Sequence, residues 1–328
     1  MLEGEEMKIL HICAGWQHWN GAANIARMIM DEQRREGHEV SFATWAKIRD
    51  LKAADEVWIH CGWLPCLWWA AFWAKNARWM PEACYDPIRL KFSAWKKRLA
   101  GPIERWSLRR CKKLVATCDA EKEWIEAYLG KKCPEIVVED IKRFFKLGVR
   151  SEELGVSGKG EFEPCRSGEV EKGESSEFRV QSWGKENSKL QTSNSKLNLL
   201  YLGRRHPLKG VKYLEFAVEE LNYFCMSRVP GGEDGCIDLR IVSGAKGEEL
   251  EKVWEWCDVL VLPTLSDNFG LVAAEALERG KRVITTDGAP AWGDGNDYGG
   301  RLMYLKGYRD GSEKERVKLL KDALMVMV

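Results

Sequence analysis

The hydrophobic and polar positions of the chain predict parallel strands that alternate with helices. Short continuous apolar runs recur along the sequence, and turns rich in polar residues or glycine separate them from segments whose apolar residues have helical spacing. Continuous apolar runs are typical of parallel strands covered on both faces, and one-sided apolar stripes are typical of the helices that cover them. We therefore expect an α/β fold.

The first half of the chain opens as a strand, a turn, a helix and a second strand within residues 7–45. Apolar residues at helical spacing over 22–36, followed by Gly37, indicate the helix. Because no GxGxxG motif follows the first strand, a dinucleotide cofactor is not indicated. The strands that the pattern predicts in this half are 8–12, 40–42, 56–61, 114–117 and 136–138, with a weak strand before residue 81.

Residues 57–74 are mostly apolar and approach the length of a transmembrane helix. His60, Gly62 and Pro65 interrupt this run. The part after Pro65, at roughly a dozen residues, is too short to cross a hydrocarbon core of about 30 Å. We expect a buried or membrane-facing helix here and not a membrane span.

The second half predicts a similar alternation, and its clearest unit begins with the apolar run 259–262. This run predicts a buried strand, 270–279 predicts a helix that ends at Gly280, and 283–284 opens another strand. The turn after the first strand contains residue types that cap helix N-termini, namely Ser266, Asp267 and Asn268. The other elements predicted in this half are strands at 199–202 and 239–242 and helices up to 221, over 247–256 and over 312–328.

The turn after residue 262 has the chemistry of an anion-binding site. Ligands of open α/β sheets bind at the carboxyl ends of strands, where a helix N-terminus directs free N–H groups and partial positive charge toward them. Gly270 allows a ligand to approach the backbone closely, and the Asp267 and Glu275 carboxylates can accept hydrogen bonds from hydroxyl groups. The alternative is that Asp267 only caps the helix and Glu275 only pairs with Arg279.

A second polar turn follows the predicted strand 199–202. Its sequence, GRRHPLKG, places the cations Arg204 and Lys209 near the carboxyl end of that strand. Such a pair suits a diphosphate whose negative charge must be stabilised as a bond to it breaks. A surface loop with unrelated charges is the alternative.

Composition narrows the class of protein. The chain has 328 residues, 45% hydrophobic residues and a net charge of +1, which indicates two globular domains and argues against a wholly basic nucleic-acid-binding protein. The 11 cysteines show no CxxC spacing, so we expect buried free thiols in a reducing compartment and no zinc site. Without a signal-peptide pattern, the protein is expected in the cytoplasm. The 16 tryptophans indicate core packing, sugar stacking or seating at a membrane interface.

Residues 88–113 carry the strongest local charge, with ten Lys or Arg residues and one acid. Large apolar side chains alternate with these cations, which is typical of helices that attach to anionic headgroups. A solvated helical face is the alternative, and no nucleic-acid-binding motif accompanies the segment. The residues predicted to contact an anionic membrane surface at the inner face of a membrane are Trp95, Lys96, Lys97, Arg98, Arg105, Trp106, Arg109 and Arg110.

Residues 150–196 differ from the rest of the chain. Gly, Ser, Glu, Lys and Asn dominate, and NSKL occurs twice, so few residues are suited to a core. This composition predicts a disordered insertion or linker. The domains expected on either side are 1–149 and 197–328.

The string Asp267-Asn268-Phe269-Gly270, followed by Glu275-Ala276-Leu277, resembles the acidic-x7-Glu motif of glycosyltransferase family 4, which comprises retaining enzymes with the GT-B fold. The resemblance implies two Rossmann-like domains that face each other across a cleft. It also implies transfer of a sugar from a nucleoside-diphosphate sugar to a cell-envelope glycan or lipid-linked acceptor. A metal or other cofactor is not expected, because two cations and a helix N-terminus can carry the charge and no DxD cluster is present.

The resemblance also assigns roles to residues. Asp267 would contact the donor sugar, Arg204 and Lys209 the leaving diphosphate, and Glu275 the ribose. On the acceptor or phosphate side, the matching residues are Asn20 and Gly21. The remaining donor-binding residues are Gly203, Asn268, Phe269, Gly270 and Leu271.

Three features differ from the family pattern or depend on it. Glu82-Ala83 stands where family members often have His-Gly, ahead of Asp86-Pro87, so Glu82 is a candidate acid or base, or a turn residue. The interval 244–258 is short and lacks the strand–helix unit that usually frames the nucleobase. In such folds the terminal helix, here 312–328, often crosses back to the first domain.

Two other functions remain open from the sequence. One is a nucleotide-sugar epimerase or a phosphorylase on the same fold. The other is a catalytically inert, membrane-attached protein that binds a sugar nucleotide. The expected partners are a nucleotide-sugar donor, a glycan or lipid-linked acceptor and an anionic membrane surface, whereas nucleic acid is not expected.

Overall fold

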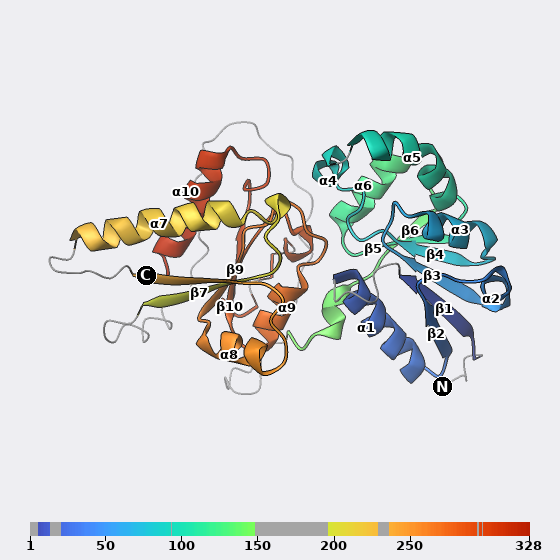
Figure 1. Ribbon diagram of the computed structural model, residues 1–328, viewed down its shortest axis with the longest axis horizontal. Helices are drawn as coiled ribbons and strands as arrows, with labels where there is room; N and C mark the ends of the chain where they lie inside the picture. Colours follow the sequence, from blue (N-terminus) through green and yellow to red (C-terminus); the bar gives the residue numbers. More distant parts are fainter. Residues whose placement is uncertain are drawn as a thin grey trace, which may run out of the picture.

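The computed structural model describes residues 6–13, 21–92, 94–147, 196–228, 236–293, 295–296 and 298–328. Within these residues, the chain forms two parallel β-sheets in two domains that lie side by side (Figure 1). The predicted insertion between the domains lies outside the described residues, apart from Lys196.

The first domain is built on a sheet whose described strands have the order β2-β1-β3-β4-β5-β6. Neighbouring strands are parallel, and Leu10 in β1 lies opposite Ser41 in β2 and Val57 in β3. Its strands are β1 (Lys8–Cys13), β2 (Glu39–Ala43), β3 (Glu56–His60), β4 (Ala77–Met80), β5 (Lys113–Ala116) and β6 (Glu135–Val138). Its helices are α1 (Gly21–Arg35), α2 (Ile48–Ala53), α3 (Pro65–Trp73), α4 (Pro87–Lys91), α5 (Ala94–Leu108) and α6 (Asp119–Leu129).

The second domain has a parallel sheet whose described strands have the order β11-β10-β9-β7-β8. The central strand β9 is buried along its whole length, and its Leu260 lies opposite Leu200 and Val283. The strands are β7 (Leu197–Leu202), β8 (Ile237–Val242), β9 (Val259–Leu262), β10 (Arg282–Thr286) and β11 (Leu302–Leu305). The helices are α7 (Val211–Arg228), α8 (Glu248–Trp256), α9 (Leu271–Glu278) and α10 (Glu313–Met325).

The two sheets confirm the predicted α/β class. Each predicted strand is present, and β9 has the bounds expected from its apolar run. The short edge strand β11, which is only half-buried in its middle, was not predicted. The apolar segment after β3 forms α3, which starts at Pro65 and buries Leu67, Ala70 and Ala71. Among the described helices, none has both the length and the apolar content needed to cross a membrane.

The expectation that the terminal helix returns to the first domain is wrong. Helix α10 packs against α7 of its own domain, as Figure 1 shows, and Lys321 of α10 forms a 2.7 Å ion pair with Glu220 of α7. Its buried residues Leu320 and Leu324 belong to the same core as Leu221. Because this apolar stripe is covered within the second domain, it has no need of a partner in the first.

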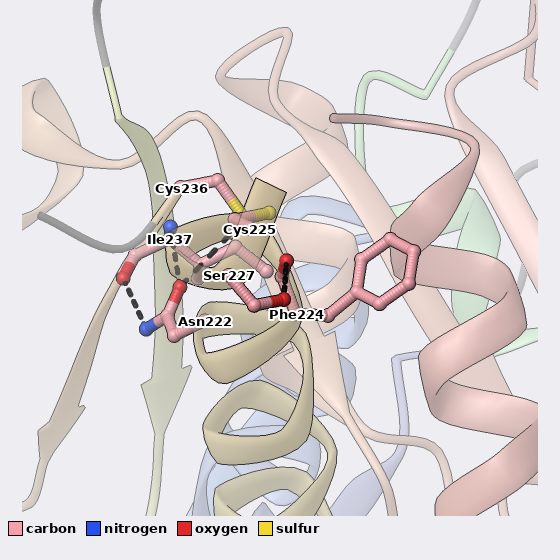
Figure 2. The surroundings of a disulfide bond; sticks show 6 residues. All are labelled: Asn222, Phe224, Cys225, Ser227, Cys236 and Ile237. Atoms are coloured by element: carbon pink, nitrogen blue, oxygen red, sulfur yellow. Dashed lines mark hydrogen bonds between the residues drawn. A yellow bond between two sulfur atoms is a disulfide. The ribbon is translucent and has the colours of Figure 1, made fainter. Parts of the chain in front are cut away.

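One cysteine pair departs from the expectation of free thiols. Cys225 near the end of α7 and Cys236 just before β8 form a disulfide (Figure 2). Beside it, Asn222 Nδ2 donates to the backbone oxygen of Ile237 at 3.0 Å, and Asn222 Oδ1 accepts from the Ile237 N–H at 2.9 Å. These contacts attach the edge strand β8 to the helix that precedes it. The other cysteines among the described residues are free.

Candidate functional site

The carboxyl ends of both sheets meet at the interface between the domains. The second domain contributes the turns after β7 and β9, and the first contributes the segment after β4 and Thr117 after β5. Open α/β sheets bind ligands at such positions. The interface is therefore the candidate site.

Lys209 and Asp267 form an ion pair between Nζ and Oδ2, and they come from turns that are 58 residues apart in the chain. Arg89 of the first domain lies 4.0 Å from the other carboxylate oxygen. Burial alone would raise the pKa of Asp267, but the two cations outweigh this effect and the pKa is lowered. Asp267 is thus a carboxylate at neutral pH that is oriented by a cation from each domain.

Close packing between two turns places Lys209 beside the end of β9. Gly210 has a φ of +64°, and a Cβ atom at this position would lie 1.9 Å from the backbone oxygen of Pro263. The backbone oxygen of Leu208 accepts a 2.8 Å hydrogen bond from the Leu265 N–H. Only glycine fits at position 210, because a side chain would collide with the Pro263 oxygen. Gly210 thereby positions the turn that carries the Lys209 ammonium group.

The predicted capping role of Ser266, Asp267 and Asn268 is wrong. Helix α9 begins after Gly270, which has a φ of +68°, and no side chain caps it. Asp267 Oδ1 instead accepts from the Asn268 N–H at 2.9 Å, and Ser266 bonds to Asp86 of the first domain. The Ala273 N–H donates to the Gly270 backbone oxygen at 2.8 Å. Because no described side chain caps the first turn of α9, the Leu271 and Val272 N–H groups remain available to an anion.

The two residues before Gly270 have different environments. Asn268 Oδ1 lies 2.7 Å from the Thr117 hydroxyl, and Asn268 Nδ2 has no partner in the part of the chain that the structure describes. Phe269 is 1% exposed and packs between Phe145 and Trp292. The amide nitrogen of Asn268 is therefore free to bind a ligand, whereas the Phe269 side chain holds the turn against the core.

Glu275 lies one helical turn after the start of α9 and does not form the alternative side-chain pair with Arg279. Arg279 donates to the backbone oxygen of Glu275 at 3.4 Å and to the carboxylate of Glu251 at 2.9 Å. The Glu275 carboxylate has no hydrogen-bond or ion-pair partner in the described ranges, and burial raises its pKa. A half-buried carboxyl without a protein partner is suited to accept hydrogen bonds from a ligand.

Arg204 and Gly203 lie in the loop that carries Lys209, but Arg204 does not join the Lys209–Asp267 pair. The Arg204 side chain is exposed, and its backbone oxygen accepts a 2.9 Å hydrogen bond from the Tyr201 hydroxyl. The Gly203 N–H continues the sheet by donating to the backbone oxygen of Val242. The structure thus unites Lys209 with Asp267 and leaves Arg204 at the edge of the site.

Asp86 and Arg89 of the first domain were not predicted as site residues. Asp86 is fully buried, caps α4 through the Ile88 N–H, and forms a 2.6 Å ion pair with Arg309 of the second domain. Arg89 Nε donates to the Ser266 hydroxyl at 2.9 Å. In the sequence, Asp86-Pro87 matches a family feature without an assigned role, and Arg89 belongs to the basic segment 88–113, which predicts a membrane surface.

Gly21 is the first residue of α1, and a Cβ atom at this position would lie 3.8 Å from Leu271 Cδ1. The N-termini of α1 and α9 therefore approach each other from the two domains. Leu271 is buried in this contact. Asn20, the other residue predicted for this side, lies outside the described residues.

Glu82 lies after β4 in a strained turn and is 5% exposed. Its φ is +56° and that of Ala83 is +58°, while the Ala83 N–H donates to the buried carboxyl of Glu121. Burial raises the pKa of Glu82 to about 8, against a smaller lowering by Arg89. Glu82 is therefore mainly a neutral acid at pH 7, and it lies on the Arg89 side of the interface, where its acceptor-side role stays a prediction.

The basic segment 88–113 divides between the interface and the protein surface. Lys97 donates to the backbone oxygen of Arg89, Arg105 lies over the Tyr128 ring, and Arg109 donates to backbone oxygens near the end of α6. On the outer face, Arg110 lies 5.1 Å from the rings of Phe72 and Trp106. The outer face comprises the exposed apolar residues Trp45, Trp69, Phe72, Trp95, Leu99, Ile103 and Trp106 with the exposed cations Lys96, Arg98 and Arg110.

Solved structures of similar fold share the arrangement of this chain. Sucrose-phosphate synthase from Thermosynechococcus elongatus aligns with 97% of this chain and 89% of its own, at a TM-score of 0.59 and 11% identity. α,α-Trehalose 6-phosphate synthase from Burkholderia multivorans aligns with 98% of this chain and 91% of its own, at a TM-score of 0.54 and 11% identity. Anabaena HepE, in complex with UDP and glucose, aligns with 97% of this chain and 90% of its own, at a TM-score of 0.53 and 14% identity.

The chain therefore has the GT-B fold, as predicted, with two Rossmann-like domains that face each other. No protein-family model matches the sequence, and no curated protein matches it.

Proposed function

We propose that the protein is a glycosyltransferase that uses a nucleoside-diphosphate sugar and resembles the retaining enzymes of family 4. The observation that carries this proposal is the Lys209–Asp267 pair beside the uncapped N-terminus of α9. A cation, free amides and an ordered carboxylate are the groups needed for a diphosphate and for sugar hydroxyls. The HepE structure, which contains UDP and glucose, supports this donor class.

The site residues of the second domain have separate roles in this proposal. The first-turn amides of α9 and the Lys209 ammonium stabilise the charge that develops on the diphosphate as the glycosidic bond breaks. Asp267 accepts hydrogen bonds from the sugar, and the unpartnered Glu275 carboxylate accepts them from the ribose. Arg204, exposed on the same loop, supplies further positive charge, so the transfer requires no metal ion.

The acceptor is proposed to be a glycan or lipid-linked molecule that enters from the first domain. The outer face of α3 and α5 supports this idea, because Trp95 is 65% exposed and Leu99 is 73% exposed beside Lys96 and Arg98. Exposed apolar side chains combined with cations are typical of helices that seat on anionic membranes. We infer peripheral attachment that brings the interface close to a membrane-borne acceptor.

Sugar transfer tests the proposed reaction. The protein is incubated with radiolabelled UDP-, GDP-, ADP- or CMP-sugars and a lipid or polysaccharide extract, with and without EDTA. We expect a labelled product with retained anomeric configuration, formation of which is unaffected by EDTA. Asp267→Asn is expected to lower kcat/KM at least 100-fold. Arg205→Ala is the matched control, because Arg205 lies on the same loop as Lys209 but pairs with Glu215 of α7.

Different outcomes identify the alternatives. Altered or released sugar without any acceptor would indicate an epimerase or phosphorylase, and donor binding without turnover would indicate an inert binding protein. Equal activity of Asp267→Asn and the unaltered protein would overturn the site.

Co-sedimentation with vesicles tests the membrane surface separately. We expect salt-sensitive binding to phosphatidylglycerol vesicles that is lost in the double variant Trp95→Ser/Leu99→Ser. The control is Tyr223→Ser on the second domain, where Tyr223 is 76% exposed. No binding to anionic vesicles, or equal binding by both variants, would contradict a membrane role for this face.

A further inference from the structure

Four buried polar side chains form a continuous hydrogen-bonded chain through the first domain. Gln33 Oε1 of α1 lies 2.7 Å from His11 Nε2, and His11 Nδ1 lies 3.0 Å from His60 Nε2. His60 Nδ1 then lies 3.3 Å from Glu82 Oε1, at the acceptor side of the interface. Both histidines are fully buried, and Gln33 and Glu82 are 7% and 5% exposed.

The carbonyl oxygen of Gln33 sets the direction of the hydrogen bonds in this chain. Because a carbonyl oxygen only accepts, His11 carries its proton on Nε2 and presents Nδ1 as an acceptor. His60 must then donate from Nε2, which leaves His60 Nδ1 as an acceptor. Both rings are neutral, since burial lowers the pKa of each to about 3. The group that completes the chain is a protonated Glu82 carboxyl.

The surroundings of Glu82 favour the same proton position. Among the described residues, no cation is dedicated to a carboxylate at this buried place, because the Arg89 guanidinium is directed to Ser266 and Asp267 and reaches only the backbone oxygen of Glu82. An unpaired buried charge is far more costly than a neutral acid. Within the part of the chain that the structure describes, the titratable or charged groups that interact with Glu82 are His60, Cys13, Cys61, Cys84, Arg89 and Glu121.

We propose that Gln33, His11 and His60 are positioning residues that hold Glu82 as a neutral acid, with its second carboxyl oxygen available to accept a hydrogen bond from a hydroxyl of the substrate. The identity of that substrate rests on the proposed function. Oε2 lies 4.0 Å from Cys61 Sγ, and no strong donor among the described residues occupies it. A neutral acid does not repel a diphosphate or the Asp267 carboxylate, whereas a second carboxylate would. The arrangement therefore suits an uncharged, hydroxyl-bearing acceptor rather than a cationic one.

Nitrogen-15 NMR of the ligand-free protein tests the direction of the hydrogen bonds from Glu82 to Gln33. The sequence contains five histidines, so His11 and His60 can be assigned from His11→Gln and His60→Gln spectra. We expect both rings to be neutral Nε2–H tautomers at pH 7. The carbon-13 signal of the Glu82 carboxyl, assigned with Glu82→Gln, is expected to titrate near pH 8. A His60 proton on Nδ1, or a Glu82 midpoint near 4.5, would overturn the proposal.

The variant Gln33→Leu tests whether the chain acts on Glu82 from a distance. Without the Gln33 acceptor, His11 no longer needs its proton on Nε2, and the chain can reverse to donate toward Glu82. We expect a lower titration midpoint for Glu82 and a change of His60 tautomer. Arg35→Ala, on the exposed side of α1, is the control. An unchanged midpoint in Gln33→Leu would refute a positioning role, and the tautomers of the unaltered protein decide the matter even where this variant does not fold.

These measurements need neither donor nor acceptor. If the protein transfers no sugar but shows the expected tautomers, the proposed function is refuted and the proposed hydrogen-bonded chain to Glu82 still holds. If the protein transfers sugar but Glu82 is a carboxylate, the proposed function holds and the proposal of a neutral Glu82 is refuted.

Discussion

Asp267 and Glu82 are acids on opposite sides of one interface, and their environments give them different charge states. Asp267 has a cation from each domain, which lowers its pKa despite burial. Glu82 faces a neutral histidine, and burial raises its pKa to about 8. Two acids whose environments separate their pKa values commonly have different roles at one site. Here Asp267 is a charged hydrogen-bond acceptor, and Glu82 is a neutral acid.

The raised pKa of Glu82 predicts a pH-dependent stability. The pKa of Glu82 is near 4.5 in the unfolded chain and about 8 in the folded protein. Its contribution to the free energy of unfolding is therefore fully present below pH 4.5. Between these values the unfolded chain releases a proton that the folded chain keeps, and stability falls by about 1.4 kcal/mol per pH unit. Glu82→Gln lacks this loss. Urea unfolding at pH 5, 6, 7 and 8 should show Glu82→Gln gaining stability relative to the unaltered protein. If the free energy of unfolding changes with pH in the same way in both proteins, the result would contradict a neutral Glu82.

The sequence predicted residues for the donor half of the site, and these roles stay predictions, but it did not predict the contacts that these residues make. Lys209 was expected at the leaving diphosphate and Asp267 at the donor sugar, and the structure pairs the two side chains directly. Asp86 and Arg89 escaped prediction because their partners lie 223 and 177 residues away and in the other domain. Local spacing carries no information about such contacts.

The turn between β7 and α7 depends on one glycine. In Gly210→Ala, a Cβ atom 1.9 Å from the Pro263 oxygen must displace the turn that carries Lys209. Gly307 also has a positive φ, +77°, but has no neighbouring atom within 4 Å, so Gly307→Ala measures the backbone strain alone.

We expect Gly307→Ala to cost about 1 kcal/mol and Gly210→Ala at least about 2 kcal/mol more, with loss of transfer activity. Thermal and urea unfolding of the two variants provide the comparison. Equal stabilities would show that the two turns do not pack as described.

Strands and helices were predicted well where the apolar pattern was continuous. The run 259–262 became β9 with the same bounds because a central parallel strand is apolar on both faces. β11 was missed because its middle residues are half-buried at the sheet edge. The helix predicted over 270–279 is present as α9, but the predicted caps are absent, because Asp267 bonds to Lys209 and Ser266 to Asp86.

Interdomain contacts hold the described domains together at their carboxyl ends. Arg309 of the second domain lies 2.6 Å from Asp86 and 4.8 Å from the ring of Trp124, both in the first domain. Asp86 is fully buried and Arg309 is 12% exposed, so this contact is shielded from solvent. Breaking a buried pair by removing one partner typically costs about 3–5 kcal/mol.

Arg309→Ala should therefore shift the domains toward an open arrangement. Small-angle X-ray scattering is expected to show a larger radius of gyration for Arg309→Ala and no change for Lys321→Ala, which removes an ion pair within the second domain. An unchanged radius in Arg309→Ala would mean that other contacts determine closure. The sequence indicated two domains, but the long-range pairs that orient them could not be read from it.

The central claim is that the interface binds a nucleoside-diphosphate sugar through Lys209 and the N-terminus of α9. A thermal-shift screen of UDP-, GDP-, ADP- and CMP-sugars tests it most directly, because a ligand that binds the native state raises the melting temperature. We predict that one nucleotide class stabilises the protein, that Lys209→Ala abolishes the effect, and that Arg205→Ala retains it. No stabilisation by any donor, or equal stabilisation of Lys209→Ala, would contradict the claim.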